Sequence, residues 1–191
     1  MDTSSGSDNI EPARVRRVVL VGGESTGKTT LVTELQAHYG CPVAGEFARD
    51  YLSSRGADYD LEQSLVLAQG QLGREDAAVR EAQARGERLV ICDTDALTTM
   101  LWAEHYFGAP HPQVPPLIED RRYDLHLLCS PEGLAWDDDG LRQSPHSRAW
   151  FTQRFREQLD QRGYRYVELD QPPAQRLAAA VAAIDQVLGM G

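Results

Sequence analysis

The chain has 191 residues, of which 41% are hydrophobic, and its formal net charge at pH 7 is -10. This length suits one α/β domain with a sizeable core, and the acidic balance argues against nucleic acid or an anionic membrane as a partner, because both require a basic surface. No apolar run is long enough to span a bilayer and the first residues lack the features of a signal peptide, so we expect a cytoplasmic protein.

The N-terminal residues 1–13 are polar, and we predict a disordered tail there and a single domain over residues 14–191. The first predicted strand covers residues 17–22, and an amphipathic helix is predicted over residues 30–39. Between them the sequence GGESTGKT at residues 22–29 fits the phosphate-binding pattern G-x-x-x-x-G-K-T, in its required strand-loop-helix setting. The sequence therefore predicts a nucleotide site at this loop.

Each residue type in this loop has a separate purpose. Glycines let the backbone wrap around a phosphate, and the following helix N-terminus adds its positive dipole end. Lys28 is expected to reach the outer phosphates, and the Thr29 hydroxyl to ligate Mg²⁺. The predicted nucleotide contacts are Gly22, Glu24, Ser25, Thr26, Gly27, Lys28, Thr29 and Thr30.

The second predicted strand, residues 41–45, is followed by Glu46 and Arg49 at the start of the next helix. A carboxylate there could take the proton of a substrate hydroxyl or hold that hydroxyl for attack; alternatively, Glu46 is only a first-turn acid that favours the helix dipole. A long helix follows over residues 61–85, with Gly86 as its stop. We expect most of its polar residues, namely Gln63, Gln69, Gln71 and Arg74, to face solvent.

The third predicted strand, residues 88–93, ends in two carboxylates. Asp93 is placed to hold Mg²⁺ or its water, as the acidic residue at a neighbouring strand end does in phosphate-loop enzymes. Asp95 could bind substrate or serve as the N-cap of the next helix. The three cysteines, Cys41, Cys92 and Cys129, have no metal-ligand spacing, and we expect Cys92 and Cys129, which lie in apolar strand patterns, to be buried thiols.

The fourth predicted strand covers residues 123–129, and the polar stretch that follows is too long for a simple connection. We predict a lid over about residues 131–150, in which Arg142 and Arg148 fold over the nucleotide phosphates and Asp138 and Asp139 orient them; a solvated charged loop is the alternative. A fifth strand over residues 165–169 and a packing helix over 172–188 complete the chain. The alternation predicts a parallel sheet with helices on both faces and ligands at the carboxyl ends of the strands.

These motifs together resemble a known family. Residues 22–29, the segment GEFAR at 45–49, DTD at 93–95 followed by TT at 98–99, and the segment from Trp136 to Arg142 are similar to the ribosylnicotinamide kinase domain of the bacterial trifunctional NAD-biosynthesis regulator, within the P-loop kinase and AAA-like ATPases. The resemblance extends over about residues 17–188. It implies a three-layer α/β/α P-loop kinase fold with a five-stranded parallel sheet and a lid.

The resemblance also implies an activity, namely transfer of the γ-phosphoryl of ATP to the 5′-hydroxyl of nicotinamide riboside, giving nicotinamide mononucleotide. Lys28, Glu46, Asp93 and Arg142 are then the expected catalytic residues, with Thr29 and Asp93 holding Mg²⁺ and Arg142 also contacting the nucleotide. The expected acceptor contacts are Glu46, Phe47, Arg49, Asp95, Trp136 and Asp138. Glu46 is the favoured general base and Asp93 its rival.

Two other functions stay open at this stage. One is a kinase of another nucleoside or small metabolite, and the other is a nucleotide-dependent regulatory switch. The regulator's adenylyltransferase and repressor motifs have no counterpart in this sequence, so we expect neither of those activities. The choice between ATP and GTP, the oligomeric state (a homo-oligomer included) and the role of the N-terminal tail are left open by the sequence.

Overall fold

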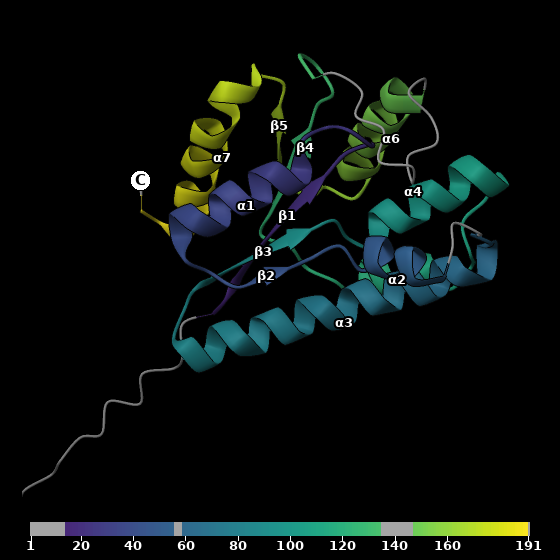
Figure 1. The fold of residues 1–191 in the computed structure, drawn as a ribbon, viewed down its shortest axis with the longest axis horizontal. Coiled ribbons are helices and arrows are strands. Elements are labelled where there is room, and N and C mark those ends of the chain that lie inside the picture. The colour runs from purple at the N-terminus through teal and green to yellow at the C-terminus, as the bar shows by residue number, and fades with distance from the viewer. Residues whose placement is uncertain (1–13, 56–58, 135–146, 191) are drawn as a thin grey trace, which may run out of the picture.

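The structure is a computed structural model that describes residues 14–55, 59–134 and 147–190 (Figure 1). Five strands are present in this part of the chain: β1 (Arg16–Val21), β2 (Val43–Ala44), β3 (Leu89–Asp93), β4 (Leu125–Cys129) and β5 (Tyr166–Leu169). The helices are α1 (Lys28–Tyr39), α2 (Phe47–Arg55), α3 (Leu61–Arg85), α4 (Ala96–Phe107), α5 (Val114–Glu119), α6 (Arg148–Gln161) and α7 (Pro173–Leu188). The predicted tail and the middle of the predicted lid lie outside the described residues.

The strands form one parallel sheet in the order β2-β3-β1-β4-β5. The central strand β1 pairs with β3 and β4, so that Val18 lies opposite Ile91 on one side and Leu125 on the other. All the strand ends that carry polar residues therefore meet at one edge of the sheet, as predicted. Strands β2 to β5 are shorter than predicted and β1 begins and ends one residue earlier, because residues at their predicted ends belong to the connecting loops.

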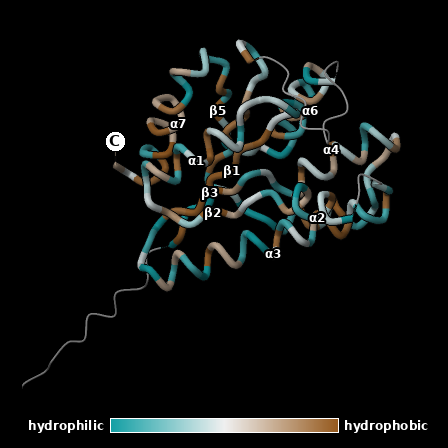
Figure 2. Tube along the Cα trace, viewed as in Figure 1, coloured by the Kyte–Doolittle hydropathy of each residue, from teal (hydrophilic) through white to brown (hydrophobic). Residues whose placement is uncertain are grey.

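Two helical layers cover the sheet (Figure 1). Alternate residues of the strands face opposite layers, so Val18 and Leu20 pack with α1 and α7, whereas Val19 and Val21 pack with the α3, α4 and α6 side. Figure 2 shows the hydrophobic residues concentrated on the central strands, while α3 alternates between hydrophobic and hydrophilic residues. The strands are buried on both faces, which explains why they read as continuous apolar runs in the sequence.

Helix α3 has the predicted bounds, and its ends are well defined. Asp60 and Gln63 form a reciprocal capping box at its start, and Gly86 adopts a left-handed conformation at its end with φ 69°. One expectation is corrected here, because Gln71 is only 1% exposed instead of facing solvent. The buried stripe of α3 follows helical spacing and includes three polar members; it consists of Ser64, Leu67, Ala68, Gln71, Glu75, Ala78 and Ala82.

Cys92 and Cys129 are free and buried, as expected, and Cys41 is also free and buried. Within residues 14–55, 59–134 and 147–190, no helix combines the length and the apolar character that crossing a membrane requires.

Candidate functional site

The phosphate-binding loop connects the central strand β1 to α1, at the middle of the polar edge of the sheet. Gly22 has φ 145°, and a Cβ built on it would lie 2.7 Å from the carbonyl oxygen of Cys129, so no other residue type fits there without displacement. Ser25 and Gly27 also have positive φ, at 51° and 77°. The Thr26 hydroxyl donates to the carbonyl oxygen of Gly23 at 2.9 Å, which closes the loop on itself.

The charges of this loop suit a polyphosphate. Lys28 extends back over the loop, where its Nζ donates to the carbonyl oxygens of Gly22 at 3.0 Å and Gly23 at 2.7 Å. Helix α1 begins at Lys28, and its N-cap residue Gly27 supplies no side-chain hydrogen bond to the first turn. An ammonium group and the positive end of a 12-residue helix thus lie at the same loop, which is the arrangement that binds phosphate groups. Thr30 is exposed on the first turn of α1.

The predicted metal ligands lie side by side. The Thr29 hydroxyl donates to Asp93 Oδ2 at 3.0 Å, although 64 residues separate them in the chain. Asp93 Oδ1 is buried and has no hydrogen-bond partner among the described residues, so its lone pairs are left for a further ligand. No cluster of three or more His, Cys, Asp or Glu side chains able to hold a metal occurs in the described ranges. A hydroxyl and one carboxylate suit Mg²⁺, which takes its remaining ligands from phosphate and water.

Glu46 faces this pair from the neighbouring strand end, just after β2. Its Oε2 accepts a hydrogen bond from Arg49 Nε at 3.3 Å, and its carbonyl oxygen accepts one from Arg74 Nη1 at 3.1 Å. Burial raises the pKa of Glu46, the Lys28 ammonium opposes that shift, and the negative charge of Asp93 adds to it. Three predicted catalytic residues, Lys28, Glu46 and Asp93, therefore lie close enough for their charges to act on one another.

Phe47 and Arg49, predicted to contact the acceptor, lie in the first turn of α2. The Phe47 ring rests on α3 at Gly70, where an added Cβ would lie 2.3 Å from a ring carbon. The guanidinium of Arg74 lies 5.1 Å from the centroid of the same ring and also pairs with Asp50 at 2.6 Å. Arg74, which was expected to face solvent, is therefore part of the wall of the site.

Asp95 is the N-cap of α4. Its Oδ1 accepts hydrogen bonds from the backbone N–H of Thr98 at 2.8 Å and from the Thr98 hydroxyl at 2.9 Å, and its side chain is buried. Burial raises the pKa of Asp95 to about 6, and the hydrogen bonds from Thr98 oppose this shift. The structure thus supports the capping alternative, while contact of Asp95 with a substrate stays a prediction.

Two arginines donate hydrogen bonds to backbone carbonyl oxygens of the phosphate-binding loop. Arg148, the first residue of α6, donates to the carbonyl oxygens of Ser25 at 3.0 Å and Pro131 at 2.9 Å, and to that of Leu134. Arg176 in α7 is 5% exposed and donates to the carbonyl oxygen of Thr26 at 3.1 Å. Arg148 was expected over the phosphates, but here its guanidinium is engaged with backbone carbonyls. No sequence motif indicated the contact of Arg176.

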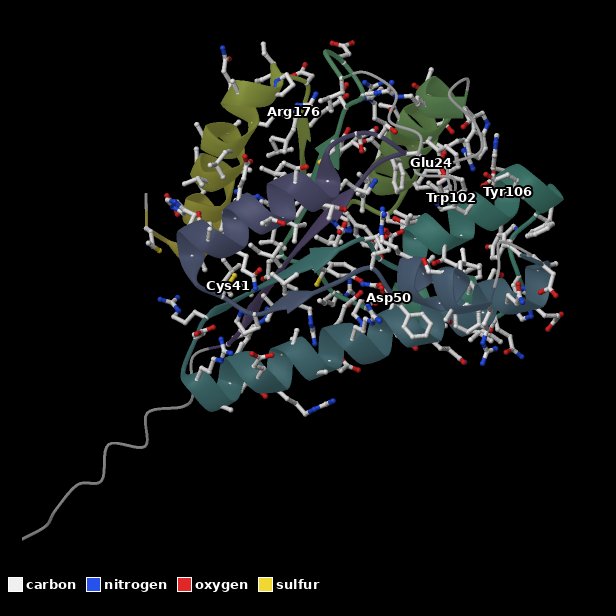
Figure 3. The ribbon with its side chains drawn as sticks, in the orientation of Figure 1. Glu24, Cys41, Asp50, Trp102, Tyr106 and Arg176 are labelled. Carbon is white, nitrogen blue, oxygen red and sulfur yellow. The ribbon has the colours of Figure 1, made fainter. Side chains whose placement is uncertain are left out.

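Aromatic side chains from α4 lie beside the loop. Trp102 and Tyr106 stack with ring centroids 5.4 Å apart, and Figure 3 shows Glu24 projecting next to them. Burial, with the charge of Glu24 as a further cause, raises the pKa of Tyr106 to about 12. Glu24 of the phosphate-binding loop is thus close to an aromatic surface. The predicted lid residues Trp136, Asp138, Asp139 and Arg142 lie outside the described residues.

Comparisons with known proteins agree with this geometry. The Trifunctional NAD biosynthesis/regulator protein NadR of Escherichia coli (strain K12) is 33% identical over 168 residues, which are 85% of this chain and 40% of that protein. A crystal structure of NadR protein in complex with NR has a TM-score of 0.77 and 28% identity, and the match covers 93% of this chain and 52% of that one. A second, in complex with NAD and AMP-PNP, has a TM-score of 0.76 and 27% identity, covering 93% and 50%.

The chain thus spans between two fifths and about half of the length of these relatives. They confirm the predicted resemblance and the predicted fold, a parallel sheet between helical layers with a phosphate-binding loop at its centre. A family model described as an AAA domain matches residues 17–176, most of the chain. The loop, the sheet order and this match together show that the chain belongs to that AAA domain family.

Proposed function

We propose that the chain transfers the γ-phosphoryl group of ATP to the 5′-hydroxyl of nicotinamide riboside, giving nicotinamide mononucleotide and ADP. The observation that carries this proposal is the position of Glu46, whose carboxylate shares a site with Lys28 of the phosphate-binding loop and with Asp93. A nucleotide switch has no need of a carboxylate on the acceptor side, whereas a kinase does. The relatives described with NR and with AMP-PNP support the same pair of substrates.

On the donor side, we assign the triphosphate to the loop of residues 22–29 and the first turn of α1. Lys28 Nζ exchanges its carbonyl contacts for phosphate oxygens, since anionic oxygens are stronger acceptors for an ammonium group. Thr29 and Asp93 would hold Mg²⁺, which neutralises charge on the β- and γ-phosphates when bound. The positive groups of the loop stabilise the charge that develops on the transferred group.

On the acceptor side, we assign Glu46 as the group that holds the 5′-hydroxyl and accepts its proton. The acceptor oxygen forms a bond to the γ-phosphorus as the bond from that phosphorus to the bridging oxygen breaks, and ADP leaves. A carboxylate whose pKa is raised by burial is a better proton acceptor at neutral pH than one in water. Asp93 is the rival, but its Oδ2 already accepts from Thr29.

The choice of nicotinamide riboside over other nucleosides rests on the relative described in complex with NR. Arg49 and Asp95 stay candidate contacts for the ribose, and Trp136, Asp138 and Arg142 stay candidate lid contacts. A cytoplasmic location and a single domain over residues 14–191 also remain predictions.

The test is product formation by purified protein with ATP, Mg²⁺ and each of nicotinamide riboside, thymidine, cytidine, uridine and adenosine. We expect nicotinamide mononucleotide, with turnover abolished in Lys28→Ala. The matched control is Thr33→Ala, an exposed position further along α1, which should leave turnover unchanged. Transfer to another nucleoside but not to nicotinamide riboside would keep the kinase function and overturn the proposed acceptor. Binding of ATP without transfer to any acceptor would favour a nucleotide-dependent switch over a kinase.

A further inference from the structure

Gln71 of α3 connects the two strand ends that carry the proposed catalytic carboxylates. Its side-chain Oε1 accepts a hydrogen bond from the backbone N–H of Phe47 at 2.9 Å. Its Nε2 donates to the carbonyl oxygens of Asp93 at 3.5 Å and Thr94 at 3.3 Å. One amide therefore contacts the segment after β2 and the segment after β3 at the same time.

The contact to Phe47 takes the place of a helix cap. Phe47 is the first residue of α2, where a backbone N–H has no partner within its own helix. Gln71 Oε1 satisfies this donor from another helix, 24 residues away in the chain. Because Glu46 immediately precedes Phe47, this hydrogen bond fixes the backbone from which the Glu46 carboxylate projects.

The contacts to Asp93 and Thr94 hold a backbone that needs support. Thr94 has φ 77°, which a β-branched residue rarely adopts, and its N–H donates to the carbonyl oxygen of Leu20 in β1 at 3.1 Å. Gln71 Nε2 provides a second restraint on the same peptide segment. The direction of the Asp93 side chain, one residue earlier, depends on this conformation.

The side-chain amide of Gln71 is buried, so it depends on these hydrogen bonds. The residue is 1% exposed, and an amide that lost its partners there would leave buried polar groups unsatisfied. Gly70, the preceding residue of α3, leaves room for the Phe47 ring. Helix α3 is thus fitted to the Glu46 segment at two successive residues.

We infer that Gln71 is a positioning residue, which sets the distance between Glu46 and the Thr29–Asp93 pair by clamping the segments after β2 and β3. Within the described part of the chain its hydrogen bonds go to the backbone of Phe47, Asp93 and Thr94, and none goes to the phosphate-binding loop. The effect on catalysis rests on the proposed kinase function, whereas the effect on the backbone does not. Loss of the clamp should reduce phosphoryl transfer while nucleotide binding is retained.

The test compares Gln71→Met with Gln69→Met, an exposed position on the same helix. Methionine is similar to glutamine in length and volume but removes the acceptor and both donors. Labelling with ¹⁵N-phenylalanine gives only four backbone amide signals, from Phe47, Phe107, Phe151 and Phe155, and the Phe47 signal is the one lost in Phe47→Leu. The other three are internal references.

In Gln71→Met we expect the Phe47 amide to exchange with solvent at least about fivefold faster, as loss of a hydrogen bond of about 1 kcal/mol implies, with the three reference amides unchanged. We expect kcat for the acceptor to fall about tenfold or more, while the Kd for AMP-PNP changes less than twofold. Gln69→Met should match the unmodified protein in all three measurements.

In Gln71→Met, unchanged exchange at the Phe47 amide, or equal losses of kcat and of AMP-PNP affinity, would overturn the inference. If Gln71→Met does not fold, Gln71→Glu serves in its place. Glutamate keeps an acceptor for the Phe47 N–H but loses the donor to the carbonyl oxygens of Asp93 and Thr94. In this variant we expect unchanged exchange at the Phe47 amide and a reduced kcat. If the unmodified protein phosphorylates no acceptor, the proposed function fails, and the exchange of the Phe47 amide alone decides the inference.

Discussion

Glu46 is the residue at which the local chemistry of the site can be tested most directly. Its carboxylate lies between a cation and an anion, since Lys28 lowers its pKa and Asp93 raises it, and burial exceeds both effects. A base that must be ionised to accept a proton loses activity as the pH falls through its pKa. The raised pKa therefore places this loss of activity at a higher pH than an ordinary glutamate would.

We predict that Glu46→Gln lowers kcat by about 10²- to 10⁴-fold, the usual range for removal of a general base, because the amide cannot take the proton. In the unmodified protein kcat/KM should rise with pH along an acid limb whose midpoint lies above the ordinary glutamate pKa of 4.5. Kinetics from pH 5 to 8 measures both effects. Glu34→Gln, an exposed carboxylate on α1, is the control.

Asp93→Asn distinguishes the rival base from a metal ligand. As a ligand, Asp93 should shift the Mg²⁺ concentration needed for half-maximal rate upward, and saturating Mg²⁺ should restore part of the activity. An acid limb that disappears in Asp93→Asn but persists in Glu46→Gln would reverse the assignment of the base.

Among the helices, α3 contributes more residues to the candidate site than its polar sequence indicates. Gly70 and Gly73 lie one turn apart on this helix, and their surroundings differ. A Cβ at Gly70 would lie between 2.3 and 2.5 Å from three carbons of the Phe47 ring, whereas nothing lies within 4 Å of a Cβ at Gly73. The two glycines therefore separate helix propensity from fit to the site.

We predict that Gly73→Ala raises the free energy of unfolding by about 0.5–1 kcal/mol, because alanine is the better helix former, and leaves kinetics unchanged. Gly70→Ala should displace the Phe47 ring and raise the KM for the acceptor about tenfold, with little change in the KM for ATP. Urea unfolding and steady-state kinetics of the two variants measure this. Equal acceptor KM values in both would contradict the role of Gly70.

For the whole molecule, a buried polar cluster connects α3 to the sheet below the site. The Glu75 carboxylate is fully buried and accepts hydrogen bonds from the Tyr123 hydroxyl at 2.8 and 2.9 Å, with Arg121 Nε 3.7 Å from Oε2. Burial raises the pKa of Glu75 to about 8, and the interactions with Tyr123 and Arg121 oppose that shift. Nearby, burial lowers the pKa of His126 to about 4.

The raised pKa of Glu75 determines how stability changes with pH. Between the unfolded pKa of 4.5 and the folded value of about 8, the folded state retains a proton that the unfolded state has released. This contribution to stability is fully present below pH 4.5 and is lost as the pH rises through 8. Its slope reaches at most about -1.4 kcal/mol per pH unit.

We predict that Glu75→Gln flattens the pH dependence of the free energy of unfolding between pH 5.5 and 7.5, relative to the unmodified protein. The amide oxygen still accepts from Tyr123, and Asp95 and His126 titrate in both proteins, so the difference between the two curves isolates Glu75. Urea unfolding at several pH values measures it. Glu81→Gln, exposed on the same helix, should follow the unmodified curve, and parallel curves for Glu75→Gln would contradict the prediction.

The sequence by itself determined the parts of this protein that depend on neighbouring residues. The apolar runs predicted the five strands, the glycine, lysine and threonine pattern predicted the phosphate-binding loop, and helix-forming composition with Gly86 predicted the bounds of α3. Glu46 and Asp93 were identified because polar residues at the ends of parallel strands meet at one edge. These patterns are local in the sequence, and pairing of the strands in a parallel sheet is enough to bring their carboxyl ends together.

Only the tertiary structure decided which polar residues support that site. Gln71 and Arg74 were expected in solvent, yet packing of α3 against β2 and β3 buries Gln71 and brings Arg74 onto Glu46. Leu67, Gln71 and Glu75 are spaced four residues apart, so they lie on one face of α3, and this spacing was a sequence signal for the burial of Gln71. The polarity of Gln71 favoured the solvent prediction instead. The contacts of Arg148 and Arg176 to the phosphate-binding loop join segments more than 120 residues apart. Such contacts depend on how the helices pack, and no local pattern encodes that packing.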